Sequence, residues 1–350
     1  MDQALFLADL GRGNTSPNPM VGAVVVSEEG LVVGTGYHEQ AGKDHAEICA
    51  LNVAGECARS ATLYCTLEPC SHFGRTTPCV ERIVSSGIGR VVIGSIDPNP
   101  VINGSGIAYL RKHGLRVDVG IRSIAAARLN EAFFTWIKKK RPFVTIKIST
   151  SLDGGVAKTI NQRTLLTSQE ANAIAHKLRS EVDAVAVGSR TLMIDDPLLT
   201  VRYGHRKKSL MRVVFDRKLR VSSSAKILST LDSGPVIIIT SEKAIKEKPK
   251  TAQLFQDLGA KLEVVEPANM LTVMRHLAGM EVTSLLLEGG PTVHRAAWEE
   301  GVVDRVKRFI APVTLGSQAV PWFQDDMLMA GLKELYVETY GPDILVEGYV

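Results

Sequence analysis

Three short groups of residues near the start of the chain carry side chains that could bind and use a metal ion. They are His45-Ala46-Glu47, Glu68-Pro69-Cys70 and Cys79. A hydrolytic zinc ion is held by three protein ligands and keeps its fourth position for water. Because the metal makes that water acidic, a carboxylate that is not a ligand must carry the proton. One histidine, two cysteines and one glutamate supply both requirements.

We therefore predict that His45, Cys70 and Cys79 are zinc ligands and that Glu47 is the catalytic proton carrier. His45 and Glu47 are separated by about 200° around a helix, so they are poorly placed to bind one metal together and suit separate roles. Asp44 and Glu47 have the spacing of a capping box, which predicts a helix that begins at Asp44. If Cys70 begins a helix after its proline, the helix N-terminus also stabilises its thiolate.

The spacing of the cysteines separates this pattern from a better-known one. The signature H-x-E…P-C-x-x-C marks zinc nucleobase deaminases, but here eight residues separate Cys70 from Cys79. The competing interpretation is a scatter of cysteines in an apolar core. For the remaining three cysteines, Cys49, Cys57 and Cys65, we expect small buried side chains. An odd number of cysteines, all within one short stretch, disfavours a disulfide framework.

Strands that alternate with helices must position these residues. In the first part we expect strands at 21–27, 31–37, 61–67 and 90–96 and helices at 79–86, 106–112 and 123–139. In the second part we expect strands at 143–148, 184–188, 212–215, 236–240, 261–265, 284–287, 305–310 and 335–339, with helices at 168–179, 252–258, 270–277 and 292–300. This alternation predicts layered α/β domains. The charged run Lys138–Arg141 before Pro142 favours a boundary there, giving domains 1–141 and 142–350; the run itself is best explained as a solvated helix end.

Composition excludes several classes of protein. The chain has 350 residues, of which 45% are hydrophobic and 22% charged, as in a globular enzyme of two domains. Its net charge of +4 comes from 41 basic and 37 acidic residues, without the basic face of a nucleic-acid-binding protein. No apolar run reaches the ~18 residues that span a bilayer, and the N-terminus does not resemble a signal peptide. We expect a cytoplasmic enzyme with a small-molecule substrate and no nucleic-acid or membrane partner. The sequence does not decide whether the protein forms a homo-oligomer.

Polar residues follow several predicted strands of the second part. They are Ser151–Gly154, Gly188–Thr191, Asp195–Arg202 and Glu288–Thr292. In α/β sheets ligands bind outside the carboxyl ends of strands, and Glu288-Gly289-Gly290 could present N–H groups to a phosphate. A simple strand-to-helix turn is the alternative. No G-x-G-x-x-G fingerprint follows a strand, so a Rossmann site is not supported.

Several sequence motifs of the first part resemble those of a known family. Thr15–Gly22, His45-Ala46-Glu47, the stretch Leu67–Cys79, Asp97–Pro100 and Asn103–Gly106 resemble the deaminase half of the RibD family, the bifunctional enzymes of riboflavin biosynthesis. The resemblance implies a cytidine-deaminase-like α/β/α domain that removes an amino group from a phosphorylated diaminopyrimidinone. Asn18 is then a candidate for binding the pyrimidine ring, with a turn residue as the equal alternative. The insert His72–Arg75 is a candidate for holding the phosphate or the ring, with a simple surface charge as the equal alternative for Arg75. His38 and His113 are expected to be solvated.

The second part resembles the reductase half of the same family. That resemblance implies a dihydrofolate-reductase-like α/β domain that uses NADPH to convert a ribosyl into a ribityl group. The implied cofactor contacts are Thr191, Asp195, Gly290, Pro291 and Thr292. The implied substrate contacts are Arg179, Leu199, Arg202 and Glu288, and a phosphate ester suits the planar donors of arginine.

The sequence departs from the family pattern at four positions of the second part. Gly155 stands where a lysine or arginine is usual, Arg163 and Leu165 replace a serine and a tryptophan, and Arg217 replaces a small residue. Three hypotheses follow. The first is a bifunctional deaminase and reductase; the second is a deaminase whose C-terminal domain is degenerate or structural. The third, a nucleic-acid-editing deaminase, is disfavoured by the even charge, the 5% aromatic content and the long cysteine spacing.

Overall fold

The chain folds into two compact units in the computed structural model, which describes residues 1–72, 77–202, 207–323 and 331–350. The units are Met1–Lys140 and Arg141–Val350, so the division falls one residue before the expected boundary. Lys138, Lys139 and Lys140 are exposed, as expected of a solvated helix end. Arg141 is not solvated, because it is buried in the second unit and forms an ion pair with Asp304 there.

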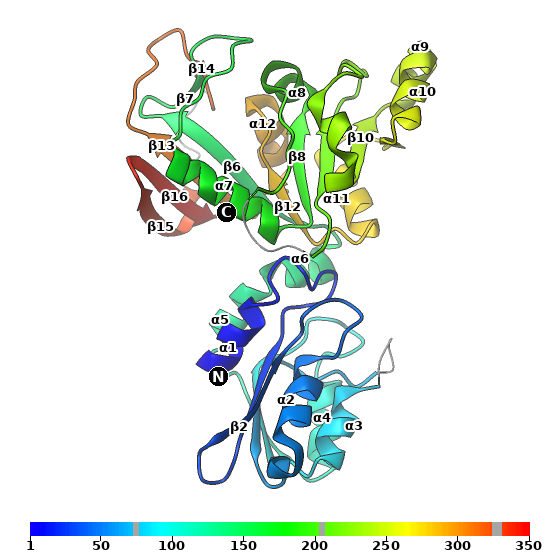
Figure 1. Ribbon diagram of the computed structural model, residues 1–350, viewed down its shortest axis with the longest axis vertical. Helices are drawn as coiled ribbons and strands as arrows, with labels where there is room; N and C mark the ends of the chain where they lie inside the picture. The colour runs from blue at the N-terminus through cyan, green and yellow to red at the C-terminus, as the bar shows by residue number, and fades with distance from the viewer. Residues whose placement is uncertain (73–76, 203–206, 324–330) are drawn as a thin grey trace. The chain divides into compact units, whose positions relative to one another are not determined.

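The first unit is a three-layered α/β/α domain around a five-stranded sheet of order β2-β1-β3-β4-β5. Strand β1 pairs antiparallel with β2 and β3, and β3, β4 and β5 are parallel. Helices α2, α3 and α4 cover one face, and α1 and α5 lie on the other (Figure 1). The elements are α1 (Asp2–Asp9), β1 (Gly22–Val26), β2 (Val32–Tyr37), α2 (Ala46–Ala54), η1 (Gly55–Ala58), β3 (Thr62–Leu67), α3 (Cys79–Ser85), β4 (Arg90–Ser95), α4 (Ser105–Lys112), β5 (Arg116–Val119), α5 (Ser123–Leu129) and α6 (Glu131–Lys139).

The expected helix 123–139 is two helices, α5 and α6, that meet at Asn130. Asn130 leaves the helical conformation, with φ −106° and ψ 22°. Its side chain is buried, where it accepts from the Met20 N–H at 2.7 Å and donates to the Met20 carbonyl at 2.8 Å. The amide therefore satisfies the backbone of a distant loop at the point where the helix breaks.

The second unit is built on a nine-stranded sheet of order β11-β10-β9-β8-β12-β6-β13-β16-β15. The first seven strands in this order are parallel, and β16 and β15 add antiparallel pairs at one edge. Strands β7 and β14 form a small separate pair. The strands are β6 (Phe143–Ser151), β7 (Gly155–Ala157), β8 (Ala184–Gly188), β9 (Met211–Phe215), β10 (Val236–Thr240), β11 (Lys261–Val264), β12 (Ser284–Leu287), β13 (Arg305–Ala311), β14 (Val320–Pro321), β15 (Lys333–Tyr340) and β16 (Asp343–Tyr349).

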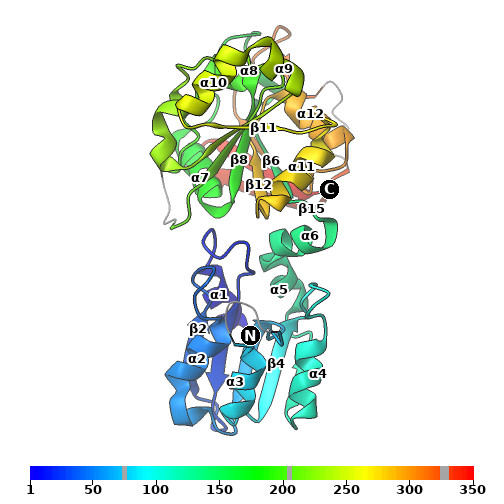
Figure 2. The same cartoon turned by 90° about the vertical axis from the view of Figure 1, so that its right-hand side faces the viewer.

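Helices cover both faces of this sheet, which explains why its central strands are apolar on both sides. Alternate residues of a strand reach different cores: Val185 packs with the face that contains α8 and α10, and Ala186 with the face that contains α11 and α12. Figure 2 shows α7 and α11 on opposite sides of the central strands. The helices are α7 (Gln169–Glu181), α8 (Ser189–Asp195), η2 (Lys226–Ser233), α9 (Glu242–Glu247), α10 (Pro249–Asp257), α11 (Met270–Gly279) and α12 (Pro291–Glu299). Among all these described segments, no helix combines the length and apolarity needed to cross a bilayer.

Candidate active sites

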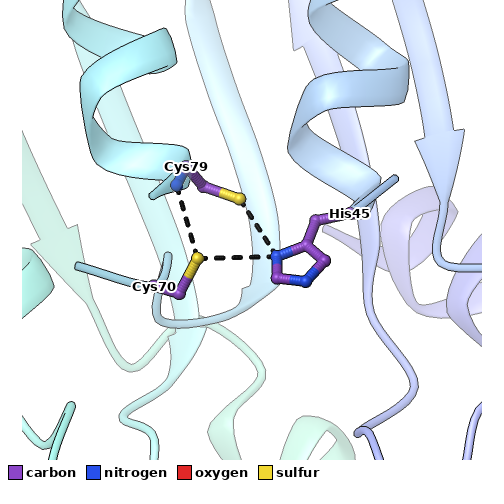
Figure 3. Close-up of side chains that lie close together, drawn as sticks. All are labelled: His45, Cys70 and Cys79. Atoms are coloured by element: carbon purple, nitrogen blue, oxygen red, sulfur yellow. Dashed lines mark hydrogen bonds between the residues drawn. The ribbon is translucent and has the colours of Figure 1, made fainter. Parts of the chain in front are cut away.

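Three metal-ligating side chains from separate segments meet in the first unit (Figure 3). His45 is the N-cap residue of α2, Cys70 lies in the loop after β3, and Cys79 is the first residue of α3. The Nδ1 atom of His45 lies 3.2 Å from Sγ of Cys79 and 3.5 Å from Sγ of Cys70. Cys70 does not begin a helix, so the condition under which a helix N-terminus would stabilise its thiolate is not met. The helix predicted at 79–86 is present and begins at Cys79, whose backbone N–H donates to Sγ of Cys70 at 3.3 Å.

The spacing of these donors suits zinc. Ligand atoms at the usual Zn–S and Zn–N distances around a tetrahedral ion lie roughly 3.5 Å apart, close to both measured separations. Hydrogen bonds from Cys79 and His45 lower the pKa of Cys70 to about 4, and the bond to Cys70 raises the pKa of His45 to about 9. The thiolate form of Cys70, which is the form that binds metal, is therefore favoured at neutral pH. The hydrogen bond with Cys70 and burial raise the pKa of Cys79, so an arriving zinc ion would displace protons from Cys79 and His45.

Glu47 lies in the first turn of α2, beside the three donors. Its side chain is 3% exposed, and burial raises the pKa of its carboxyl group above the usual value. A raised pKa brings a carboxylate closer to the range in which it both accepts and releases protons near neutrality. Glu47 is not one of the three clustered donors, in agreement with separate roles for His45 and Glu47.

Glu68 holds together the loops around the donor cluster. The sequence places it next to Pro69 and Cys70 but did not predict this role. It is 3% exposed and its carboxylate accepts four backbone N–H groups at 3.0–3.3 Å, those of Asp97, Gly104, Gly106 and Ile107. The packing is tight, because a Cβ atom on Gly106 would lie 2.2 Å from the carbonyl oxygen of Pro69. Glu68 thus fixes the segment that leads to Cys70 against the start of α4.

Asn18 and His38 form a polar chain beside His45, and the expectation that His38 is solvated is wrong. His38 is 2% exposed. Its Nδ1 lies 3.0 Å from the Asp44 carbonyl oxygen, and its Nε2 lies 3.1 Å from Nδ2 of Asn18. The predicted capping box is also wrong, because His45 and not Asp44 is the N-cap of α2, and no side chain caps that helix. The backbone carbonyl of Asp44 instead orients His38, and His38 orients Asn18.

The remaining predictions for the first unit have mixed outcomes. Cys65 is buried as expected, Cys49 is half-buried, and Cys57 is exposed because it lies in the short η1 turn at the end of α2. His113 is exposed and stacks on Tyr109. The candidate Arg75 lies outside the described residues.

The second unit has a pocket of about 300 Å³ at the carboxyl ends of β6, β8 and β12. The expected cofactor contacts all line it: Thr191, Asp195, Gly290, Pro291 and Thr292. Glu288 lines it as well, directly after β12. Gly290 is the N-cap residue of α12, so the first turn of that helix faces the pocket and favours an anionic group there. Strand ends separated by a hundred residues in the sequence thus share one cavity.

The expected substrate contacts of the second unit are only partly brought together. Arg179 and Glu288 form a bidentate ion pair at 2.6 and 2.7 Å, with both side chains largely buried. Arg179 also donates to the Thr200 carbonyl at 3.3 Å, which ties the 199–202 segment to this pair. Leu199 is buried and Arg202 is exposed, and neither lines the pocket.

Lys147 is a pocket residue that the sequence analysis missed. It lies on β6, lines the pocket and donates to Oγ of Ser149 at 3.2 Å. Burial lowers the pKa of its ammonium group. The signal that could have found it is a lysine between Ile146 and Ile148 on a predicted strand, since a buried lysine is rare unless its charge is used or paired.

Comparison with known proteins gives matches to both parts of the chain. Residues 1–95 match the model of the cytidine and deoxycytidylate deaminase zinc-binding region, and residues 142–346 match that of the RibD C-terminal domain. Riboflavin biosynthesis protein RibD of Aquifex aeolicus is 45% identical over 99% of this chain and 96% of its own. The protein of that name from Escherichia coli is 35% identical, over 91% and 88%. The chain belongs to the RibD family.

Solved structures of RibD proteins agree with this assignment. Acinetobacter baumannii RibD has a TM-score of 0.88 at 33% identity, with 99% of this chain and 97% of that chain covered. A deaminase/reductase of the same family from Thermotoga maritima has a TM-score of 0.87 at 33% identity, covering 100% and 97%. The expected fold classes are confirmed, and the chain is a bifunctional enzyme with a zinc-binding deaminase domain and a reductase domain.

None of the four departures from the RibD pattern is among the residues that line the pocket of the second unit. Gly155 begins β7, where a Cβ atom would lie 2.9 Å from Cβ of Ala319, so a larger residue would need the segment before β14 to move. Arg163 is close enough to Asp195 to oppose the rise that burial causes in the pKa of Asp195. Leu165 is 80% exposed and Arg217 is exposed, and neither lines the pocket.

Proposed function

We propose that the first domain deaminates 2,5-diamino-6-(5-phosphoribosylamino)pyrimidin-4-one to 5-amino-6-(5-phosphoribosylamino)uracil. We propose that the second domain then reduces the ribosyl group to ribityl with NADPH. The observation that carries the proposal is the meeting of His45, Cys70 and Cys79 beside the buried Glu47. The relative from Thermotoga maritima carries both of these activities in its description, as a diaminohydroxyphosphoribosylaminopyrimidine deaminase and a 5-amino-6-(5-phosphoribosylamino)uracil reductase.

In the deaminase site His45, Cys70 and Cys79 hold zinc, which when bound supplies the Lewis acidity that makes water a nucleophile near neutral pH. Glu47 accepts a proton from the attacking water and delivers it to the departing amine. The C2–N bond breaks, a C2–O bond forms, and ammonia leaves. Burial of Glu47 supports this role because it keeps the proton affinity of the carboxylate high.

Asn18 orients the pyrimidine ring in this proposal. A neutral His38 that donates from Nδ1 to the Asp44 carbonyl accepts at Nε2 from the side-chain amide of Asn18. The amide oxygen of Asn18 is then the atom that can accept from a ring N–H or an amino group. Asn18 also closes a turn, because its backbone N–H donates to the Thr15 carbonyl at 2.9 Å, but a turn alone does not account for the contact between its side chain and His38.

In the reductase site NADPH supplies a hydride when bound. Thr191, Asp195 and the turn Gly290-Pro291-Thr292 hold the cofactor, whose phosphates suit the first turn of α12. Glu288, fixed by Arg179, and Lys147 face the sugar. Leu199 and Arg202 contact the remainder of the substrate, with Arg202 at its phosphate. The reaction adds a hydride to C1′ and a proton to the ring oxygen, which opens the sugar.

We infer a cytoplasmic enzyme whose partner is the small phosphorylated pyrimidine and not a nucleic acid or a membrane. The net charge of +4, spread over 41 basic and 37 acidic residues, is compatible with that partner.

The test supplies purified enzyme with the diaminopyrimidine phosphate and identifies the products with and without NADPH. Ammonia and the ribosylaminouracil are expected without NADPH, and the ribitylaminouracil with it. Absence of ammonia release from zinc-replete enzyme would contradict the first step. Ammonia release without any reduced product would contradict the second and favour a deaminase with a degenerate or structural C-terminal domain.

A further inference from the structure

A buried hydrogen-bonded bridge runs behind the pocket of the second unit. His294 of α12 is 0% exposed and Trp322, which follows β14, is 4% exposed. Nε2 of His294 lies 3.1 Å from the carbonyl oxygen of Leu287, the last residue of β12. Nε1 of Trp322 donates to Nδ1 of His294 at 3.0 Å. We call Leu287, His294 and Trp322 the histidine bridge.

The two partners determine which nitrogen of His294 carries the proton. A carbonyl oxygen only accepts, and an indole N–H only donates. Nε2 therefore carries the proton and Nδ1 does not, so the imidazole is neutral. Burial lowers the pKa of His294 to about 4, which keeps the ring in this form at neutral pH. Both bonds are thus made at once by a single tautomer.

The two ends of the histidine bridge belong to two different walls of the pocket. Leu287 is followed by the segment 288–293, every residue of which lines the pocket. Trp322 follows β14, which pairs with β7, and the Trp322 backbone N–H donates to the Gly154 carbonyl at 3.1 Å. Val156 and Ala157 of β7 and Val320 of β14 line the other wall. His294 is therefore the link between the walls, although it does not itself line the pocket.

We propose that His294 is a positioning residue for the reduction, because it sets the separation between the segment 288–293 and the β7–β14 strand pair across the dinucleotide pocket. The inference rests on the proposed function, in which this pocket takes NADPH. Leu287 directly precedes Glu288, so a shift at one end of the bridge moves the carboxylate that pairs with Arg179. A shift at the other end moves the β7–β14 strand pair, which lines the pocket.

Two polar substitutions separate the two bonds of His294. The amide of His294→Gln reaches the position of Nε2 and can still donate to the Leu287 carbonyl, but it no longer accepts the hydrogen bond from the indole N–H of Trp322. The shorter side chain in His294→Asn reaches the position of Nδ1 and can still accept from Trp322. Trp322→Phe removes the donor and keeps a ring. His276→Gln on α11 is the matched control, because this histidine is partly exposed and pairs with Glu263 away from the pocket.

The experiment measures the NADPH dissociation constant of each full-length variant by fluorescence titration, and ammonia release by the same samples. Loss of one hydrogen bond is worth roughly a fivefold change in the constant. We expect about this weakening in His294→Gln and in Trp322→Phe, and no further weakening in the double variant, because both changes break the same bond. The indole N–H resonance of Trp322 should shift in His294→Gln and stay near its original position in His294→Asn. Ammonia release and the His276→Gln control should be unchanged.

The outcomes distinguish the inference from the function on which it rests. NADPH binding by the parent enzyme with equal constants in His294→Gln and Trp322→Phe would overturn the inference alone. Losses that add in the double variant would also overturn it, because they would indicate two separate structural defects. Failure of the parent enzyme to bind NADPH would overturn the proposed cofactor and the inference together.

Discussion

At the scale of single residues, the sulfur atoms of Cys70 and Cys79 are the groups that a hydroxyl cannot replace, since zinc binds thiolate far better than alcohol. We expect Cys70→Ser and Cys79→Ser each to lose both zinc and ammonia release. Elemental analysis of the purified variants measures the first, and an ammonia assay the second. Cys57→Ser is the matched control, because that cysteine is exposed and outside the cluster. Full zinc occupancy in both active-site variants would disprove the ligand assignment.

Glu47 can be tested without disturbing the metal. Glu47→Gln keeps the shape of the side chain but cannot carry a proton. Zinc content should stay unchanged while the rate of deamination falls by about 100-fold or more, as is usual for loss of a general acid–base group. Glu56→Gln, on the exposed η1 turn, provides a control with the same chemical change. Near-normal ammonia release from Glu47→Gln would remove this residue from the mechanism.

The residues that could be predicted from the sequence are those that lie in short motifs of recognisable chemistry. His45, Glu47, Cys70 and Cys79 have spacings that point to one type of metal site. His38 and Lys147 could not be placed in the same way. Their environments depend on segments distant in the chain, such as Asn18 for His38 and the turn after β12 for Lys147.

At the scale of elements, hydrophobic periodicity predicted most central strands and the longer helices. It did not predict the break between α5 and α6, since Asn130 leaves the helix to bind the backbone of Met20. Strands β7 and β14 also escaped prediction. They have three and two residues and pair only with each other, so each is too short to show a period.

The ion pair between Arg141 and Asp304 joins the start of β6 to the start of β13. The guanidinium makes two bonds to the carboxylate, at 2.5 and 2.9 Å, and the carboxylate also accepts from the Val144 N–H at 2.9 Å. Arg141→Met leaves a buried carboxylate without its cation, and we expect the free energy of unfolding to fall by about 3 kcal/mol. Urea unfolding of the variant, followed by tryptophan fluorescence, measures this loss.

A second substitution separates the lost cation from the lost packing. Asp304→Asn in the Arg141→Met background removes the unpaired charge and still accepts from Val144, so it should restore at least half of the lost stability. An unfolding free energy in Arg141→Met equal to that of the parent enzyme would show that the pair contributes nothing.

At the scale of the whole molecule, each unit has its own sheet and its own apolar core. Two independent sites are therefore expected. Arg202→Ala should slow NADPH oxidation with the deaminated intermediate by at least about tenfold, because a charge-assisted contact to phosphate is lost, and it should leave ammonia release intact. Nicotinamide absorbance against time measures the oxidation. Arg59→Ala, an exposed arginine of the first unit, is the control.

Two results would contradict this expectation of independent sites. A parallel loss of ammonia release in Arg202→Ala would mean that the substitution acts on the whole chain. Unchanged NADPH oxidation in Arg202→Ala would remove Arg202 from the substrate site.

The strand order of the larger sheet has a consequence for how the protein is made. Strand β6 is the first strand of its unit to leave the ribosome, yet its neighbours in the sheet are β12 and β13, which begin at Ser284 and Arg305. At about 5–20 residues per second, this segment waits on the order of ten seconds for its partners. During that time we expect the nascent chain to need a chaperone, while the smaller first unit has already folded. Proteolysis of ribosome-bound chains arrested near residue 260 should cut only beyond Lys140, and equal protection on both sides would contradict this order of events.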